Sequence, residues 1–295
     1  MRKRTTPFYL STSFLMNKSL NDPNTISILG CGWFGLALAK HLRANNYIVK
    51  GSTTRIEKLA LIKEQGIQPY LINFEEDRHE YDPEFFKSTT LIITIPPKRN
   101  SAEQYSFAKK IAAISDAAKN QIIQNVLFIS STAVYANTNE VVDESTHPIP
   151  ETDSGKVLLE SEKLLQAQPE FKTTILRFAG LVGPSRDPGR FFAGKNDVPN
   201  GMAPINLIHL NDCIGITMQI ISQNAFGLII NGCAPHHPSK QDFYTAAALR
   251  SSFPKPSFID ELKTWKTITS TQTPYYLKYK YLIDNWTDWL AQDKL

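Results

Sequence analysis

A glycine-rich turn constrains the fold of this chain more than any other feature. It follows an apolar run at 25–29 and has the spacing G-x-G-x-x-G, in the residues Gly30-Cys31-Gly32-Trp33-Phe34-Gly35. Beyond it, apolar residues recur every three to four positions, which predicts a helix. A strand-to-helix turn of this kind lets the backbone approach a pyrophosphate at the helix N-terminus. The sequence therefore predicts a dinucleotide site, and the alternative is a glycine turn that serves packing alone.

Apolar runs alternate with helical patterns as far as residue 183. Strands are predicted at 25–30, 47–53, 67–74, 89–95, 125–131 and 173–179, and helices at 35–45, 55–65, 100–122 and 154–168. Strands that are apolar throughout and separated by helices indicate a parallel sheet with both faces covered. Right-handed crossovers then give an α/β fold with a doubly wound parallel sheet of the Rossmann type.

The pattern changes after about residue 180, where turn-forming Gly and Pro residues crowd the chain. Two further strands are predicted there, at 204–210 and 226–232 with a helix between them, and two helices, at 239–251 and 279–293. We therefore expect three parts. These are a disordered basic tail at 1–23, a dinucleotide-binding Rossmann domain at 24–180, and a small C-terminal substrate lobe at 181–295 that is interleaved with the last sheet strands.

The formal net charge of +4 comes from the first 20 residues, which hold four basic residues and no acid. This stretch has the composition of a targeting peptide but lacks a long apolar core, so we favour an unstructured tail, with Met16 as an alternative start. The rest of the chain is neutral, which argues against nucleic-acid binding. No apolar run reaches the roughly 18 residues of a membrane helix. We expect a cytoplasmic monomer or homodimer with a small-molecule substrate.

The three cysteines, Cys31, Cys213 and Cys233, are far apart and lack the spacing of metal ligands. They indicate reduced thiols and no metal site.

The cofactor is indicated by Thr54 and Arg55, because an NAD site usually has an acid about 20 residues beyond the last glycine. Arg55 lies 20 residues beyond Gly35 and suits a 2′-phosphate, so NADP is expected, with NAD as second choice. The alternative is a solvated Arg55 that only opens the next helix. Pro96, after the strand at 89–95, joins the predicted cofactor residues.

Three further segments resemble motifs of the extended short-chain dehydrogenase/reductases, a group that includes nucleotide-sugar epimerases. They are Ser130-Ser131-Thr132-Ala133-Val134-Tyr135, the strand and loop at 176–184, and the segment at 206–212. With the glycine turn they extend from about residue 25 to about residue 235. The resemblance implies that the Ser131 hydroxyl bonds a substrate carbonyl or alcohol. The alternative is that Ser130 and Ser131 only cap a turn.

The catalytic pair of that family, Tyr-x-x-x-Lys, is missing. Ser154 stands at the position of the tyrosine and Leu158 at that of the lysine. A serine hydroxyl does not ionise near neutral pH, so Ser154 cannot replace the tyrosine as acid or base. The chain is therefore identified as a member of the atypical short-chain dehydrogenase/reductases. The substitutes considered for the proton donor are His236, His237 and Tyr135, with His236 first because histidine titrates in the right range.

Arginines could hold a substrate phosphate or carboxylate, and the sequence favours Arg190 over Arg177 and Arg186, because a glycine-flanked loop contains it. Two functions remain open. The first is an NAD(P)-dependent oxidoreductase or epimerase-like enzyme that acts on a small polar substrate, with sugar- or phosphate-containing compounds as candidates. The second is a noncatalytic NADP-binding or redox-sensing protein that kept the fold and lost the catalytic pair.

Overall fold

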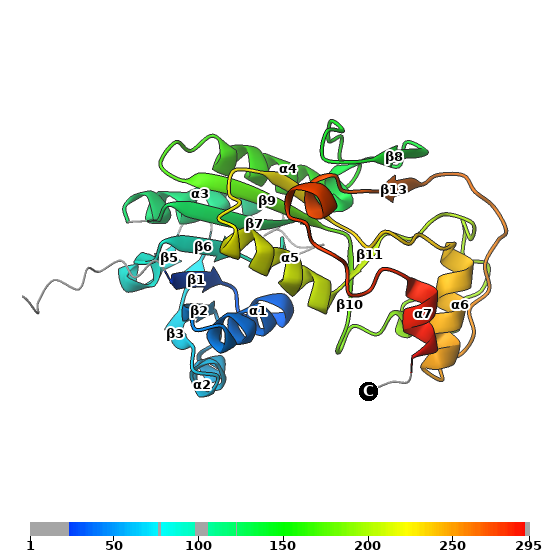
Figure 1. Cartoon of the computed structure of the whole chain (residues 1–295), viewed down its shortest axis with the longest axis horizontal. Helices are drawn as coiled ribbons and strands as arrows, with labels where there is room; N and C mark the ends of the chain where they lie inside the picture. Colours follow the sequence, from blue (N-terminus) through cyan, green and yellow to red (C-terminus); the bar gives the residue numbers. More distant parts are fainter. Residues whose placement is uncertain (1–23, 76–77, 98–105, 122, 293–295) are drawn as a thin grey trace, which may run out of the picture.

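The computed structural model describes residues 24–75, 78–97, 106–121 and 123–292. Seven parallel strands form its central sheet, namely β1 (Thr25–Leu29), β2 (Ile48–Thr53), β3 (Gln68–Leu71), β6 (Thr90–Ile93), β7 (Asn125–Ser131), β9 (Lys172–Phe178) and β12 (Ile229–Gly232). Their order across the sheet is β12-β9-β7-β6-β1-β2-β3 (Figure 1). The predicted doubly wound parallel sheet is confirmed.

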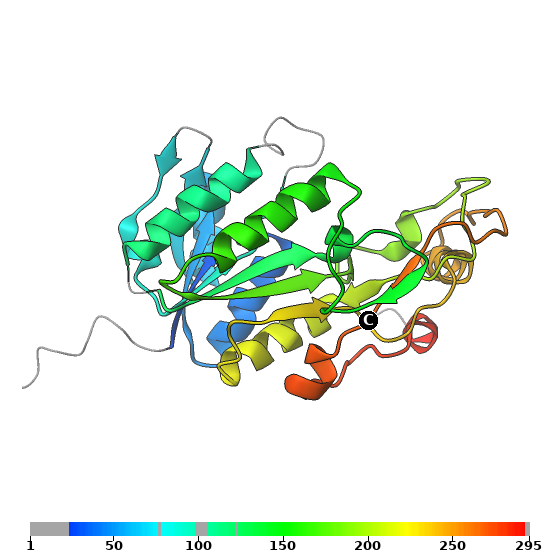
Figure 2. The same cartoon turned by 90° about the horizontal axis from the view of Figure 1, so that it is seen from above.

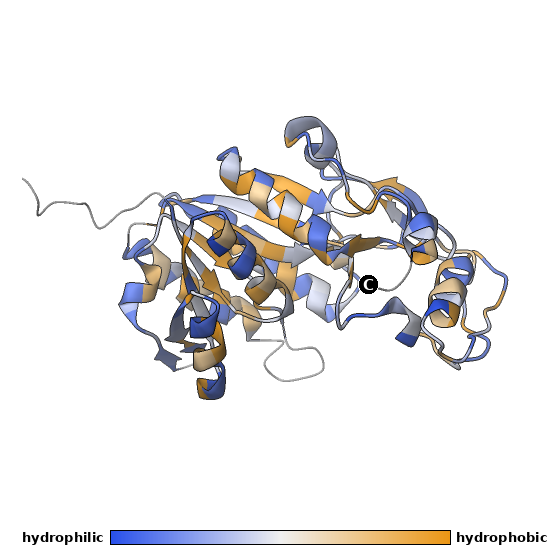
Figure 3. Ribbon diagram, turned by 60° about the horizontal axis from the view of Figure 1, so that its bottom comes forward, coloured by the Kyte–Doolittle hydropathy of each residue, from blue (hydrophilic) through white to orange (hydrophobic). Residues whose placement is uncertain are grey.

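Helices cover both faces of this sheet (Figure 2). On one face α1 (Trp33–Ala44) packs beside α5 (Leu210–Ser222), and on the other α3 (Phe107–Lys119) packs beside α4 (Asp153–Gln166). The inner strands β1 and β6 are buried along their whole length, as expected for a sheet covered on both faces. Figure 3 shows the hydrophobic strands lying between helices of mixed polarity.

The strand order reverses beside β1, because β2 and β3 extend the sheet to one side and β6, β7, β9 and β12 to the other. Ligands bind in the crevice at the carboxyl ends of the strands at such a switch point. Here the crevice lies between the ends of β1 and β6, where the Thr94 hydroxyl donates a hydrogen bond of 2.6 Å to the carbonyl of Gly30. The fold thus places the glycine turn where a ligand is expected.

The chain beyond residue 180 adds a second group of elements beside the carboxyl ends of the strands (Figure 1). They are β10 (Gly180–Val182), β11 (Leu207–His209), α6 (Lys240–Arg250), β13 (Lys266–Ile268) and α7 (Trp286–Ala291), and β13 pairs with β8 (Glu140–Val142). A small core that includes Phe243 and Trp286 joins β10, β11, α6 and α7, whereas Ile268 of β13 packs into the main core. Because α5 and β12 also lie beyond residue 180 and belong to the main sheet layers, the domain division stays a prediction.

Several predicted elements differ from the observed ones. The helix expected at 55–65 is a 3-10 turn (Ile56–Lys58) followed by α2 (Leu59–Glu64), and the strand expected at 67–74 is split into β3 and β4 (Asn73–Phe74), which pairs with β5 (His79–Glu80). The predicted tail and the start of the helix predicted at 100–122 lie outside the described residues. No helix in the described ranges is long and apolar enough to cross a membrane.

The last predicted helix, at 279–293, is reduced to α7 because its first residues bond elsewhere. The buried carboxylate of Asp212, in the first turn of α5, accepts hydrogen bonds from the Tyr279 hydroxyl and from the backbone N–H groups of Leu282 and Ile283. Two of these donors are backbone groups that belong to no helix. The segment therefore runs along the start of α5 before Asn285 caps α7.

Candidate cofactor and active site

Glycine is found at the three positions of the turn for different structural reasons. Gly30 has φ of +106°, and a Cβ atom on Gly35 would lie 2.2 Å from the carbonyl oxygen of Gly30. The fold itself therefore requires glycine at these two positions. A Cβ atom on Gly32 would meet nothing within 4 Å, although Gly32 caps the N-terminus of α1. Open space above this backbone leaves room for a pyrophosphate at the helix N-terminus.

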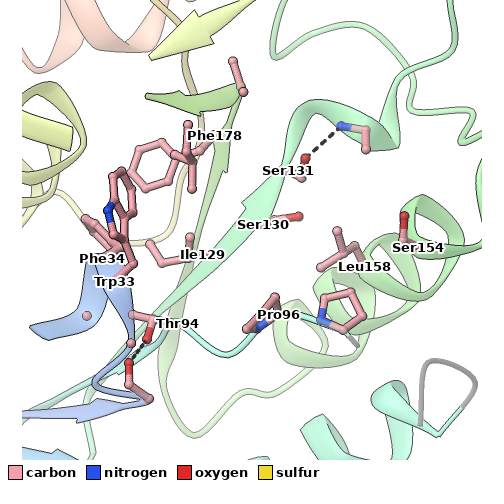
Figure 4. Close-up of a pocket in the computed structure, with 18 of the residues that line it drawn as sticks. Trp33, Phe34, Thr94, Pro96, Ile129, Ser130, Ser131, Ser154, Leu158 and Phe178 are labelled. Carbon is pink, nitrogen blue, oxygen red and sulfur yellow. Dashed lines mark hydrogen bonds between the residues drawn. The ribbon is translucent and has the colours of Figure 1, made fainter. Parts of the chain in front are cut away.

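A cavity of about 610 Å³, here the central pocket, opens at the carboxyl ends of the strands beside the glycine turn (Figure 4). The start of α4 forms its opposite wall. Its lining residues are Gly30, Gly32, Trp33, Phe34, Gly35, Thr94, Pro96, Pro97, Ile129, Ser130, Ser131, Ala133, Ser154, Leu158, Phe178, Ala179, Gly180, Leu181 and Arg186. Mostly apolar walls with a few hydroxyl groups and one guanidinium are typical of a small-molecule site.

A second cavity of about 500 Å³, here the β2 pocket, lies at the end of β2. It shares Gly30, Gly32 and Pro96 with the central pocket, and its other lining residues include Cys31, Thr53, Thr54, Arg55, Lys58, Glu75 and Lys110. The two pockets therefore adjoin at the glycine turn. Every residue predicted to bind the cofactor lines one pocket or both.

Two of the three predicted catalytic residues line the central pocket. The oxygen of the Ser131 hydroxyl accepts a hydrogen bond of 3.2 Å from the N–H of Ala133, which caps a 3-10 turn at 132–134. A Cβ atom on Gly155 would lie 2.5 Å from the Ala133 carbonyl oxygen, so α4 packs tightly against this turn. That contact brings Ser154, whose hydroxyl oxygen lies 3.3 Å from that of Thr152, to the wall opposite the glycine turn.

Comparison with known proteins identifies the family. No protein-family model matches the chain. The chain is 36% identical to Protein YeeZ of Escherichia coli K12 over 245 residues, which cover 82% of this chain and 89% of that protein. The chain belongs to the YeeZ family of atypical short-chain dehydrogenase/reductases. The predicted family resemblance is confirmed.

Solved structures show the same fold for this YeeZ-family chain. A UDP-glucuronic acid 4-epimerase from Bacillus cereus, in complex with NAD, matches with a TM-score of 0.75 and 17% identity over 91% of this chain and 97% of that one. A functionally unknown conserved protein from Silicibacter pomeroyi matches with a TM-score of 0.72 and 21% identity, over 90% and 96%. At these identities the likeness extends to the fold alone.

His236, the third predicted catalytic residue of the YeeZ-family chain, lies outside both pockets. Its Nδ1 accepts a hydrogen bond of 3.0 Å from the N–H of Trp286, at the start of α7. The ring of His237 bonds the Ile205 carbonyl, and burial lowers its pKa. Both histidines thus hold the C-terminal elements together. His236 is not among the residues that line the central pocket, and its role as proton donor stays a prediction.

Tyr135 is likewise not among the lining residues, and a buried polar network holds its hydroxyl. The Arg177 guanidinium donates to its hydroxyl at 2.7 Å, and burial raises the pKa of Tyr135. Arg177 forms an ion pair with Glu162, and Ser130 donates to Glu162 at 2.5 Å. No sequence pattern predicts this network, because its two charged residues lie on separate elements, Glu162 on α4 and Arg177 on β9.

The arginine that reaches the central pocket is Arg186, whereas the sequence favoured Arg190. The guanidinium of Arg190 lies 5.4 Å from the ring centre of Phe253, outside both pockets, and Arg177 is engaged with Glu162. The guanidinium carbon of Arg186 lies 4.4 Å from the ring centre of Trp33, at the rim of the pocket. The path of the loop determines which arginine lines the pocket, and no local sequence pattern predicts that path.

The cysteine in the glycine turn is a buried free thiol. Burial raises the pKa of Cys31 to about 12, so its thiol stays protonated at neutral pH. Cys213 and Cys233 are fully buried free thiols, and their pKa values are raised for the same reason. Within the part of the chain that the structure describes, no group of three or more His, Cys, Asp or Glu side chains is placed to hold a metal ion.

Proposed function

We propose that this YeeZ-family protein is an NADP-dependent oxidoreductase or epimerase-like enzyme that acts on a small polar substrate. The observation that carries the proposal is the pair of adjoining pockets that meet above Gly32, the one glycine of the turn that protein packing does not require. Nucleotide sugars and other phosphate-containing compounds are candidate substrates, because the B. cereus structure of the same fold is named a UDP-glucuronic acid 4-epimerase.

The residues present fit a dinucleotide at the glycine turn. Its pyrophosphate would lie over Gly32 at the start of α1, with the nicotinamide end in the central pocket and the adenosine end in the β2 pocket. A bound nicotinamide cofactor supplies hydride transfer. The chain then has to bind the substrate against the nicotinamide end, orient its reacting carbon and keep bulk water out.

Basic residues in the β2 pocket support NADP over NAD. Arg55 is exposed at the pocket edge and Lys58 is half-buried one 3-10 turn later, and both line the pocket. Two cations at the end of β2 favour the extra phosphate on the adenosine ribose. The carboxylate of Glu75 also lines this pocket and offsets part of their charge.

The test is to measure the dissociation constants of NADPH and NADH by nicotinamide fluorescence. Changing Arg55→Ala should remove most of the preference for NADPH, about 1–3 kcal/mol for a lost bond to a charged group. The matched control is Lys63→Ala, which removes an exposed cation from α2 outside both pockets and should leave the preference unchanged. Equal affinities for the two cofactors in the unchanged protein would overturn the NADP assignment, and failure to bind either would overturn the proposed function.

Ser131 is the residue we assign to the substrate. Its oxygen already accepts a hydrogen bond from Ala133, so its own hydroxyl proton is left to donate to a substrate carbonyl or alcohol oxygen. Ser154 offers a second hydroxyl on the facing wall. Neither side chain ionises near neutral pH, so these two residues position the reacting oxygen and do not themselves set a pH optimum.

The alternative is a noncatalytic NADP-binding or redox-sensing protein. Ser154 and Leu158, at the positions of the family's tyrosine and lysine, both line the central pocket, which favours this alternative. The buried thiols count against sensing by cysteine oxidation, because reactive cysteines are accessible and have a lowered pKa. Turnover of any substrate with NADPH would decide for the enzyme.

A further inference from the structure

We infer that Arg186, mounted on the indole of Trp33, is the binding group for an oxyanion of the substrate, either a phosphate or a carboxylate. The inference rests on the proposed function and adds the charge of the substrate to it. Arg186 lies on the loop that follows β10. This loop turns at Gly183 and brings Arg186 to the rim of the central pocket.

The loop is fixed to the glycine turn by two contacts of one side chain. The indole N–H of Trp33 donates a hydrogen bond of 2.6 Å to the carbonyl of Pro184, and the indole face carries the Arg186 guanidinium. The backbone between them closes a turn, in which the N–H of Arg186 donates to the Gly183 carbonyl at 2.9 Å. Gly183, with φ of +149°, would bring a Cβ atom within 3.2 Å of the Trp33 ring. The position of Arg186 is therefore set by Trp33.

The guanidinium retains its capacity to bind an anion. Arg186 is exposed, and it has no ion pair or side-chain hydrogen bond among the described residues. Stacking on an aromatic face uses the plane of a guanidinium and leaves its N–H groups free at the edge. Those N–H groups form a planar fork that matches the two oxygens of a carboxylate or phosphate.

The position of Arg186 points to the substrate and not to the cofactor. Arg186 lines the central pocket together with Gly180 and Leu181 of β10, and it does not line the β2 pocket. Ser131, at the end of β7, and Ser154, at the start of α4, line the same cavity (Figure 4). A small molecule in this cavity could offer an oxygen to Ser131 and an anionic end to Arg186. Neutral substrates would leave the guanidinium without a partner.

The experiment uses protein saturated with NADP⁺, so that the cofactor's own phosphates occupy the glycine turn and the β2 pocket. Inorganic phosphate and malonate are then titrated separately by calorimetry, as probes of the two oxyanion classes. We expect saturable binding of at least one probe, weakened roughly tenfold or more by Arg186→Gln. The matched control Arg190→Gln removes the neighbouring loop cation on Phe253 and should change nothing.

The role of Trp33 in holding Arg186 is tested with the same NADP⁺-saturated protein. Trp33→Leu should weaken the probe about as much as Arg186→Gln, and Trp33→Phe, which keeps an aromatic face, should restore most of the affinity. A purely structural role would give no such rescue. The inference is overturned if neither probe binds, if Arg186→Gln binds as well as the unchanged protein, or if Arg186→Gln loses NADP⁺ affinity instead. Failure of the unchanged protein to bind NADP⁺ would be a separate result against the proposed function.

Discussion

Removing the charge of Glu162 should destabilise the protein strongly, although Glu162 itself lines neither pocket. Glu162 and Arg177 have side chains that are 1% and 2% exposed. Glu162 accepts hydrogen bonds from Arg177 Nε at 3.0 Å and from Nη2 at 2.5 Å, and from the Ser130 hydroxyl at 2.5 Å. The Glu162→Gln side chain can offer one acceptor oxygen only, and its amide group then faces a donor.

The loss follows from these contacts. Two charge-assisted bonds contribute about 1.5–3 kcal/mol each, and breaking a buried pair costs about 3–5 kcal/mol because the other charge stays buried without a partner. We therefore expect Glu162→Gln to lower the free energy of unfolding by about 3–5 kcal/mol, measured by urea denaturation. Glu160→Gln, on the exposed face of the same helix, should stay within about 0.5 kcal/mol of the unchanged protein.

A double variant tests whether the lost stability comes from the buried charge that is left without a partner. Changing Glu162→Leu and Arg177→Met together removes both charges and should recover most of the stability that Glu162→Gln loses, because no charge stays buried alone. The reasoning is refuted if Glu162→Gln unfolds within about 0.5 kcal/mol of the unchanged protein. It is also refuted if the double variant is the less stable of the two.

Two further predictions concern the missing Tyr-Lys pair and the three cysteine thiols. Changing Ser154→Tyr and Leu158→Lys together should give NADPH-dependent carbonyl reduction if the site lacks an acid, and should slow turnover of the natural substrate if another group supplies the proton. A folded double variant that binds NADPH and changes neither activity would contradict the placement of Ser154. At about pH 8 the folded protein should not react with Ellman's reagent within minutes, because burial raises the pKa of Cys31 to about 12. Denatured protein should give three equivalents, and fast reaction of one thiol before denaturation would contradict the buried placement.

The sheet could be predicted because each strand and helix carries its own local pattern. The apolar runs at 25–29 and 90–93 sit in the two buried strands that border the crevice, and the glycine turn follows the first of them. Those patterns depend only on neighbours along the chain. The β2 pocket followed for the same reason, since Thr54 and Arg55 come directly after a strand.

The residues on the substrate side of the central pocket could not be predicted in this way, because contacts between distant segments determine which side chains reach it. His236 has the right chemistry for a proton donor, but its partner is the N–H of Trp286, 50 residues later. Arg186 reaches the central pocket through a contact with Trp33, about 150 residues earlier. A loop's path over the surface is set by such tertiary contacts, which leave no period or spacing in the sequence.

The carboxylate of Asp212 has a consequence for how the protein is made. Its three donors lie 67 to 71 residues later in the chain, and Asp212 is fully buried. Until that segment has left the ribosome, the Asp212 carboxylate at the start of α5 lacks these three donors. The hydrogen bonds that fix the start of α5 are therefore completed only near the end of synthesis. Attachment of the 279–283 segment to α5 becomes one of the last folding events, and this interval is when chaperones would be needed.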